Sequence, residues 1–157
     1  MRKPRELKKG AYYHVYNRAN RKEMIMNSKE IKNLFIEVLR RSKKKYKYRL
    51  INFVLMPNHF HMLIKPLGNE KLSRIMQWIT SVFAQKFNKI FNYVGHVWCD
   101  RYKSKIIKSS KQFYRTFEYI AENPIRAGLV QKMEEYKYYG SNKKFLKIYE
   151  LIDPIPT

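Results

Sequence analysis

Two apolar segments joined by a Pro-Asn pair most constrain how this chain can fold. Residues 48–56 (YRLINFVLM) and 59–65 (HFHMLIK) each have the length and the apolar side chains of a buried β-strand. Pro57 and Asn58, which separate them, are typical of a tight turn. The sequence therefore predicts a β-hairpin in the middle of the chain.

Segments of strand and helix character alternate around this hairpin. Strands are predicted at residues 11–17 and 103–108. Apolar side chains at helical spacing predict three helices. The first ends at about residue 44, the second covers residues 72–87 and the third covers residues 111–122. The first six elements match a ferredoxin-like βαββαβ layout of the α+β class, with helices on one face of the sheet. The other face is left open for a ligand or an additional helix.

Local signals predict where two of the helices begin and end. Asn27 followed by Glu30 forms a capping-box pattern at the start of the first helix. Pro124 disfavours helical geometry at the residue before it, so the third helix is expected to stop there.

The length of 157 residues suits one domain, so we expect residues 1–157 to form a single domain with residues 141–157 as a C-terminal tail. No apolar run approaches the length needed to span a membrane. The basic first ten residues lack the apolar stretch of a secretory signal. We therefore expect a cytoplasmic protein with no membrane partner.

The charge balance is the first indication of function. The chain has 34 Lys and Arg residues against 12 Asp and Glu residues, a formal net charge of +22. Such a surface favours a polyanionic partner, and a nucleic acid gains affinity from the counterions that its phosphates release. A basic protein without such a partner, or one that binds acidic membranes, remains an alternative.

A pair of histidines lies on the second strand of the hairpin. Residues two apart on a strand point to the same side, so His59 and His61 share one face while Phe60, Met62 and Ile64 share the other. The apolar set belongs against the helices, which leaves both imidazoles on the open face. Two imidazoles can hold a divalent metal and leave positions free for substrate oxygens. Two unrelated histidines, one bonded to backbone, are the alternative.

A tyrosine and an asparagine share one side of the third predicted helix. Tyr119 and Asn123 are four residues apart, next to a buried stripe of Phe113, Phe117 and Ile120. A phenol is a hydroxyl nucleophile, and an amide oxygen is a hard metal ligand. With 13 tyrosines in the chain, an ordinary core or surface tyrosine before a helix stop is an equally open interpretation.

Four ordered blocks resemble the single-tyrosine HUH transposases, especially their REP-associated branch. The histidine pair lies in LMPNHFH (residues 55–61), which is similar to the HUH signature. YIAENPIRAGLV (residues 119–130) resembles the tyrosine-helix block. YYHVYNR (residues 12–18) resembles the first strand, and residues 95–104 resemble the segment before the last strand.

The resemblance implies a ferredoxin-like fold and a tyrosine-bearing helix that closes over the histidine pair. It implies that His59 and His61 bind the metal, that Tyr119 is the nucleophile and that Asn123 is the third ligand. Members of the insertion-sequence type often carry glutamine at that last position, one methylene longer than the asparagine found here.

The resemblance also implies an activity. The enzyme would be a DNA transposase or nickase that cleaves and rejoins single-stranded DNA through a 5′-phosphotyrosine, at hairpin-forming element ends or repeats. Mg²⁺ or Mn²⁺ would assist as the divalent metal. Relatives act as homodimers or alone, so the oligomeric state stays open.

Basic side chains around the last predicted strand are candidates to bind the DNA backbone. Arg101 precedes this strand, and Lys103, Lys105 and Lys108 recur along it. Further candidates are Arg18 and Arg126, which lie in two of the matching blocks. A solvated charged strand is the alternative for any one lysine.

Two other functions compete with the enzyme. A non-catalytic single-stranded nucleic-acid-binding module would need the basic face and the aromatic side chains but neither Tyr119 nor the histidine pair. A metal-binding or metal-sensing protein would need only the histidines.

Overall fold

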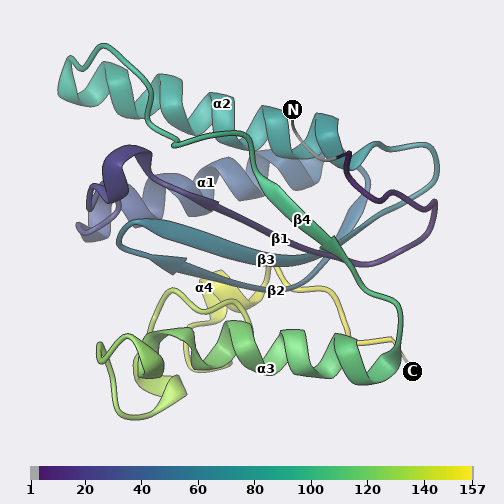
Figure 1. Cartoon of the computed structure of the whole chain (residues 1–157). Helices are drawn as coiled ribbons and strands as arrows, with labels where there is room; N and C mark the ends of the chain where they lie inside the picture. Colours follow the sequence, from purple (N-terminus) through teal and green to yellow (C-terminus); the bar gives the residue numbers. More distant parts are fainter. Residues whose placement is uncertain (1–3, 157) are drawn as a thin grey trace.

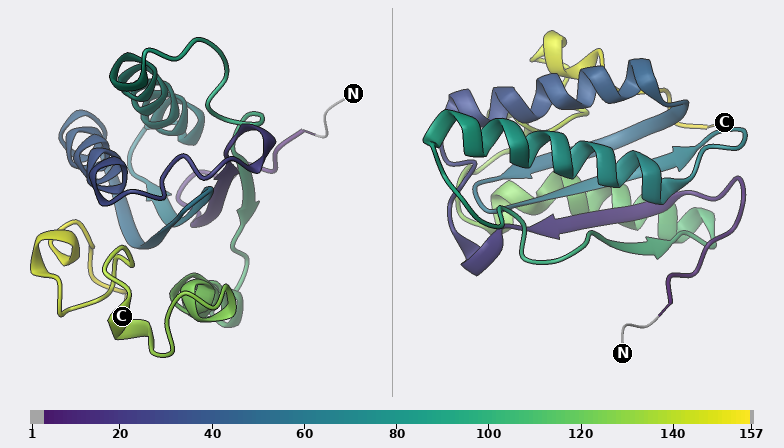
Figure 2. Two further views of the ribbon diagram at one scale, coloured as in Figure 1. Left: turned by 90° about the vertical axis from the view of Figure 1, so that its left-hand side faces the viewer. Right: turned by 90° about the horizontal axis from the view of Figure 1, so that it is seen from above.

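A four-stranded sheet with helices on both faces makes up the computed structural model, which describes residues 4–156 (Figure 1). One face carries two long helices, α1 (Lys29–Lys45) and α2 (Leu72–Phe91). The opposite face carries the helix α3 (Ser110–Arg126) and the short helix α4 (Leu146–Tyr149), as the end-on view in Figure 2 makes clear. The additional helix expected on the open face is therefore α3.

The strands are β1 (Tyr13–Arg18), β2 (Tyr48–Met56), β3 (His59–Pro66) and β4 (Lys103–Ile106). They lie in the order β2-β3-β1-β4, and each neighbouring pair is antiparallel. Met56 pairs with His59, so Pro57 and Asn58 form the two-residue turn of the predicted hairpin. This order and the element sequence confirm the ferredoxin-like α+β fold.

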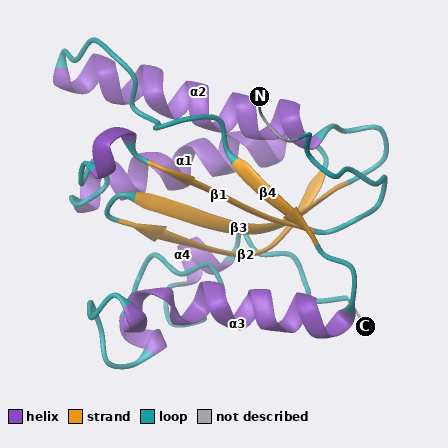
Figure 3. Ribbon diagram, viewed as in Figure 1, coloured by secondary structure: helices purple, strands orange, loops and turns teal. Residues whose placement is uncertain are grey.

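The main core lies between the sheet and the pair α1 and α2, which run side by side above it (Figure 2). Phe35 of α1, Phe83 of α2 and Phe60 of β3 meet there at full burial. Trp98, in the long loop before β4 that Figure 3 draws, packs its ring against all three. These contacts fix which face of β3 is apolar.

The first helix begins one residue later than its expected cap. Ser28 is the N-cap, and its hydroxyl accepts a hydrogen bond from the Ile31 amide at 3.2 Å. The prediction of Asn27 as the cap was therefore wrong. Serine and asparagine cap helices about equally well, so the sequence alone did not separate the two neighbours.

The tyrosine-bearing helix continues through Pro124 to Arg126, which corrects the expected stop. Proline removes one backbone donor and crowds the preceding turn, but here it lies close to the helix end, where little of the helix follows. The last turn stays closed because the Ala127 amide donates to the Asn123 carbonyl at 3.0 Å. Asn123 consequently projects from a helical turn.

The segment after α3 covers the outer edge of β2. It contains the 3₁₀ turn η2 (Met133–Glu135), and its backbone bonds β2 through Leu55 N to Tyr138 O and Gly140 N to Phe53 O. A Cβ on Gly140 would lie 2.6 Å from the Phe53 ring, so only glycine allows this close approach.

Residues 141–156 pack against the sheet, whereas the sequence suggested a tail. The Asp153 carboxylate accepts from the Leu50 amide at 2.8 Å and forms an ion pair with Lys43 of α1. Ile148 and Leu151 are buried. Residue 157 lies outside the described residues.

Within residues 4–156, every helix is too short or too polar to cross a membrane.

Candidate active site

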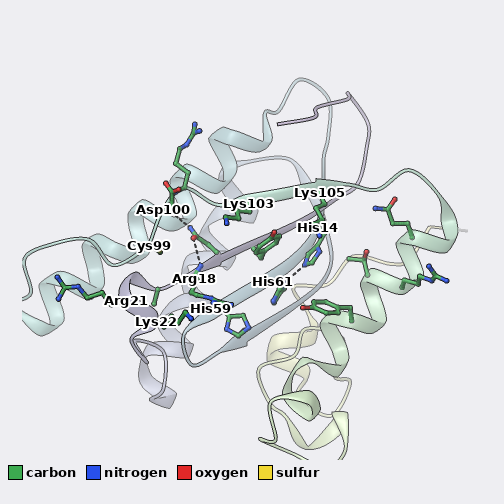
Figure 4. Close-up of a pocket in the computed structure, with 18 residues that line it drawn as sticks. His14, Arg18, Arg21, Lys22, His59, His61, Cys99, Asp100, Lys103 and Lys105 are labelled. Carbon is green, nitrogen blue, oxygen red and sulfur yellow. Dashed lines mark hydrogen bonds between the residues drawn. The ribbon is translucent and has the colours of Figure 1, made fainter. Parts of the chain in front are cut away.

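A cleft of about 980 Å³ opens on the face of the sheet that carries α3 (Figure 4). This helix packs over β2 and β3, while β1 and β4 form the floor of the cleft beside it. The far wall is the 3₁₀ turn η1 (Asn20–Lys22) together with residues 99–101. The cleft is therefore an open groove across the sheet.

Strand register places the histidine pair on the floor of this groove. His59 lies opposite Arg18 of β1, and His61 lies opposite Tyr16. Directly paired residues of an antiparallel sheet point to the same face, so these four side chains share the groove side. Phe60, on the other face, is fully buried in the core. The predicted division of β3 into an apolar and a histidine face matches this arrangement.

Each imidazole has its Nδ1 atom engaged. His59 Nδ1 lies 2.7 Å from Asn58 Oδ1, and the amide of Asn58 is oriented by a 3.4 Å hydrogen bond from its Nδ2 to the Lys22 carbonyl. Asn58 Oδ1 is thus an acceptor, which favours the His59 tautomer with its proton on Nδ1. His61 Nδ1 lies 2.8 Å from His14 Nε2 (Figure 4). The Nε2 atoms of both rings remain for a ligand.

The histidines of the floor are neutral at physiological pH. Burial lowers the pKa of His61 to about 2, reinforced by His14, His59 and nearby arginines. Burial also lowers the pKa of His14 to about 4, with a smaller effect of Lys105. The pKa of His59 is lowered too, first by burial. Neutral imidazoles keep the lone pair that a metal requires.

Tyr119 of α3 lies directly over the histidines. Its ring centroid is 5.5 Å from that of His61 and 5.8 Å from that of His14, edge to face in both cases. The side chain is 44% exposed and lines the groove, so its hydroxyl is accessible to a ligand there. The Arg126 guanidinium lies 4.2 Å from the centre of this ring and donates to the Tyr119 carbonyl.

Asn123, one turn further along α3, faces His59. Its Oδ1 atom is 3.5 Å from His59 Nε2, and the side chain is buried. When the His59 proton is on Nδ1, as the contact with Asn58 Oδ1 favours, His59 Nε2 and Asn123 Oδ1 both offer lone pairs. A cation in contact with both would satisfy them. The structure thus brings His59, His61, Tyr119 and Asn123 together.

The donor atoms suit a divalent metal of borderline to hard character. Among the described residues, no group of three or more His, Cys, Asp or Glu side chains is arranged to hold a metal ion by itself. Two imidazoles and one amide oxygen would leave coordination positions for phosphate oxygens and water.

Most of the expected DNA-binding residues line the groove, and two do not. Arg18, Arg101, Lys103 and Lys105 belong to its lining. Lys108 lies beyond the end of β4 and forms an ion pair with Glu6 at 3.0 Å. The remaining candidate, Arg126, contacts Tyr119 and Glu122 instead.

Sequence reasoning missed several residues of the site. The sequence did not assign His14, Arg21, Lys22 or Arg115 to the site, although His14 bonds His61 and all four residues line the groove. Alternation along the first strand places His14 and Tyr16 on one face, but their contact with His61 depends on the pairing of β1 with β3. The signal for Arg115 was its spacing of four from Tyr119 on one helix.

The sequence of residues 8–123 matches the family of IS200-like transposases. The chain belongs to this family. Among the curated proteins compared with this transposase, none matches it.

Two solved structures are similar to this transposase in fold. A REP-associated tyrosine transposase bound to a REP hairpin has a TM-score of 0.75 at 18% identity, covering 99% of this chain and 93% of that one. A protein of Deinococcus radiodurans assigned as a transposase has a TM-score of 0.55 at 18% identity, covering 78% of this chain and 97% of that one. Both likenesses support the fold.

Proposed function

We propose that this transposase cleaves and rejoins single-stranded DNA, with Tyr119 as the nucleophile and His59, His61 and Asn123 as ligands of a divalent metal. The observation that carries the proposal is the contact of the Tyr119 ring with His61 in a groove lined by lysine and arginine side chains. A nucleophile beside an ion site, with a basic path leading to it, suits attack on a phosphodiester.

In this proposal the phenolic oxygen of Tyr119 attacks the scissile phosphorus. The bond from phosphorus to the 3′ oxygen of the preceding nucleotide breaks, and that oxygen leaves as a hydroxyl after taking up a proton. The phenol loses its proton, and a 5′-phosphotyrosine forms. Attack by another 3′-hydroxyl reverses the step without ATP, because the phosphodiester energy is conserved in the covalent link.

The residues of the groove have two proposed roles, DNA binding and metal binding. Arg18, Lys103 and Lys105 would hold the DNA backbone across the floor of the sheet. His59, His61 and Asn123 would hold Mg²⁺ or Mn²⁺, which when bound supplies Lewis-acid polarisation of the phosphate.

The proposed substrate is single-stranded DNA that bears a hairpin. Support comes from the fold neighbour bound to a REP hairpin and from the net charge of +22. The experiment incubates the protein with a fluorescent hairpin-bearing strand and Mn²⁺, followed by a denaturing gel. We expect a covalent adduct that Tyr119→Phe abolishes.

Tyr114→Phe is the matched control, since Tyr114 is another exposed tyrosine of α3 that lies outside the groove lining. It should form the adduct as the unmodified protein does. DNA binding without any adduct would favour a non-catalytic binding module, and metal binding without DNA binding would favour a metal sensor.

We further propose that one chain supplies the whole site. Tyr119 contacts His61 of its own chain, so catalysis needs no second copy. Mixing Tyr119→Phe with His61→Ala should then fail to restore the adduct. Restored cleavage in the mixture would mean that tyrosine and histidines combine between two subunits.

A further inference from the structure

The ring of His61 is held from one side of the groove by two residues of β1. His14 Nε2 lies 2.8 Å from His61 Nδ1, with the two rings stacked at 5.0 Å between centroids and an interplanar angle of 28°. Tyr16, two residues along β1, stacks on the same imidazole at 5.6 Å and 29°. Alternate residues of one strand thus flank His61, and one of them is bonded to it.

We propose that His14 is a positioning residue that accepts a hydrogen bond from His61 Nδ1–H and thereby fixes His61 with its Nε2 lone pair directed at the metal. The inference rests on the proposed metal site. A neutral imidazole carries one proton, so His61 can offer Nε2 to an ion only when that proton is on Nδ1. The acceptor that selects this tautomer is His14 Nε2, and His14 must then carry its own proton on Nδ1.

The other histidine of the pair has an equivalent partner. His59 donates from Nδ1 to Asn58 Oδ1, and Asn58 is anchored by the Lys22 carbonyl. Both imidazoles therefore present Nε2 because a neighbour occupies Nδ1. Such outer partners set the tautomer and ring orientation of ligating histidines. One partner comes from the hairpin turn and the other from the adjacent strand.

Three variants separate positioning from packing. His14→Phe keeps a ring that can stack on His61 but removes the acceptor. His14→Gln can place an amide oxygen near the position of Nε2 and restore it. His96→Phe is the control, because His96 is an exposed histidine outside the groove lining.

The first measurement is Mn²⁺ affinity of the DNA-free protein, from the electron paramagnetic resonance signal of free Mn²⁺. We expect His14→Phe to weaken binding by about 10-fold to 100-fold, the usual effect of removing an outer partner. His14→Gln should recover most of that loss, and His96→Phe should bind as the unmodified protein does. Thermal unfolding of each variant tells a loss of ligand orientation from a loss of fold.

The second measurement needs no variant of His14. Long-range ¹H–¹⁵N correlation spectra of the metal-free protein report the tautomer of each imidazole, and we expect the His61 proton on Nδ1. A His61 proton on Nε2 overturns the proposal, as does His14→Phe binding Mn²⁺ as tightly as the unmodified protein. An unmodified protein that binds no Mn²⁺ overturns the metal site itself, and with it this inference.

Discussion

The two faces of β3 differ more than any other neighbouring parts of this protein. Phe60, Met62 and Ile64 are fully buried against α1 and α2, whereas His59 and His61, alternating with them, face the groove under Tyr119. One face is apolar and closed, and the other carries the two histidines beside the buried Leu63 and is only partly covered. One strand of eight residues thus supports the core on one side and the proposed chemistry on the other.

The two faces also differ in how they are covered. Two long helices close the first face, and the aromatic cluster around Phe35 fills the space between them and the sheet. On the second face α3 packs over β2 and β3, and the segment after it follows the edge of β2. The floor over β1 and β4 stays accessible, so polar side chains there keep contact with solvent or substrate.

Substitutions at adjacent positions of β3 should separate these roles most strongly. Phe60→Ala removes a fully buried ring and is expected to cost about 3–5 kcal/mol of the free energy of unfolding. His61→Ala should cost less, about 1–3 kcal/mol, because it removes a buried neutral imidazole and leaves the His14 ring without its hydrogen-bond partner. Its effect should instead fall on metal binding. Urea denaturation measures both, and equal destabilisation would contradict the division.

The contact that joins α3 to the sheet gives a second way to test the comparison. Asn52 is fully buried; it donates to the Phe117 carbonyl at 3.3 Å and accepts from the Ser141 amide and hydroxyl. Asn52→Ala removes these buried hydrogen bonds and should cost about 1–3 kcal/mol. Hydrogen exchange should rise in α3 more than in α1.

Ser141→Ala is the matched control for that substitution. It removes the hydroxyl but keeps the backbone hydrogen bond to Asn52, so the loss should be about 1 kcal/mol or smaller. If Asn52→Ala loosens α1 as much as α3, the residue supports the whole sheet rather than the tyrosine helix.

The sequence predicted the fold and the core face of the sheet, under α1 and α2, better than it predicted the groove. The hairpin followed from two apolar runs and a Pro-Asn turn, and β2 has the expected bounds of Tyr48–Met56. The fold class followed from the order of the elements. These features depend on residues near one another in the chain, which is where periodicity carries information.

Features that depend on contacts between residues far apart in the sequence were not predicted. The register of β2 against β3 shifts between Leu50 and Asn52. This shift places Asn52, which has apolar neighbours on both sides in the sequence, on the face of the sheet that carries α3. The packing of residues 141–156 depends on Asp153 reaching both Leu50 and Lys43. No local pattern encodes either contact.

The residues of the site show the same difference between features set by local pattern and features set by distant contacts. The shared face of His59 and His61 followed from the two-residue period of a strand. The contact between His14 and His61 required the pairing of β1 with β3, which the alternation of one strand cannot supply. The continuation of α3 past Pro124 shows that a proline rule gives a preference which packing can override.

Acid should weaken the groove face selectively. In the metal-free protein the pKa of His14 and of His61 is lowered to about 4 and about 2, so the unfolded chain takes up protons more readily than the folded one. Stability is then full above about pH 6.5 and falls as the pH drops toward these values. We expect Tm to fall by a few degrees between pH 7 and pH 5, a window that largely avoids carboxylate titration.

His14→Gln removes one of the groups that take up a proton on unfolding in this window. Its Tm should therefore fall less between the same two pH values than that of the unmodified protein. An identical fall would mean that the groove histidines do not link protonation to folding.

The smallest expected effect distinguishes a lysine inside the groove from one outside it. Lys103 lines the groove, whereas Lys108 pairs with Glu6 beyond the end of β4. If Lys103 binds one phosphate of a single strand, Lys103→Ala lowers the slope of log K against log salt concentration by about 0.7. Lys108→Ala should change the slope less, because its charge is already partly neutralised by Glu6. Fluorescence anisotropy with a single strand over a range of salt concentrations measures both slopes. Equal changes would mean that DNA follows the whole outer edge of β4, so that charge density, more than the shape of the groove, guides the strand toward Tyr119.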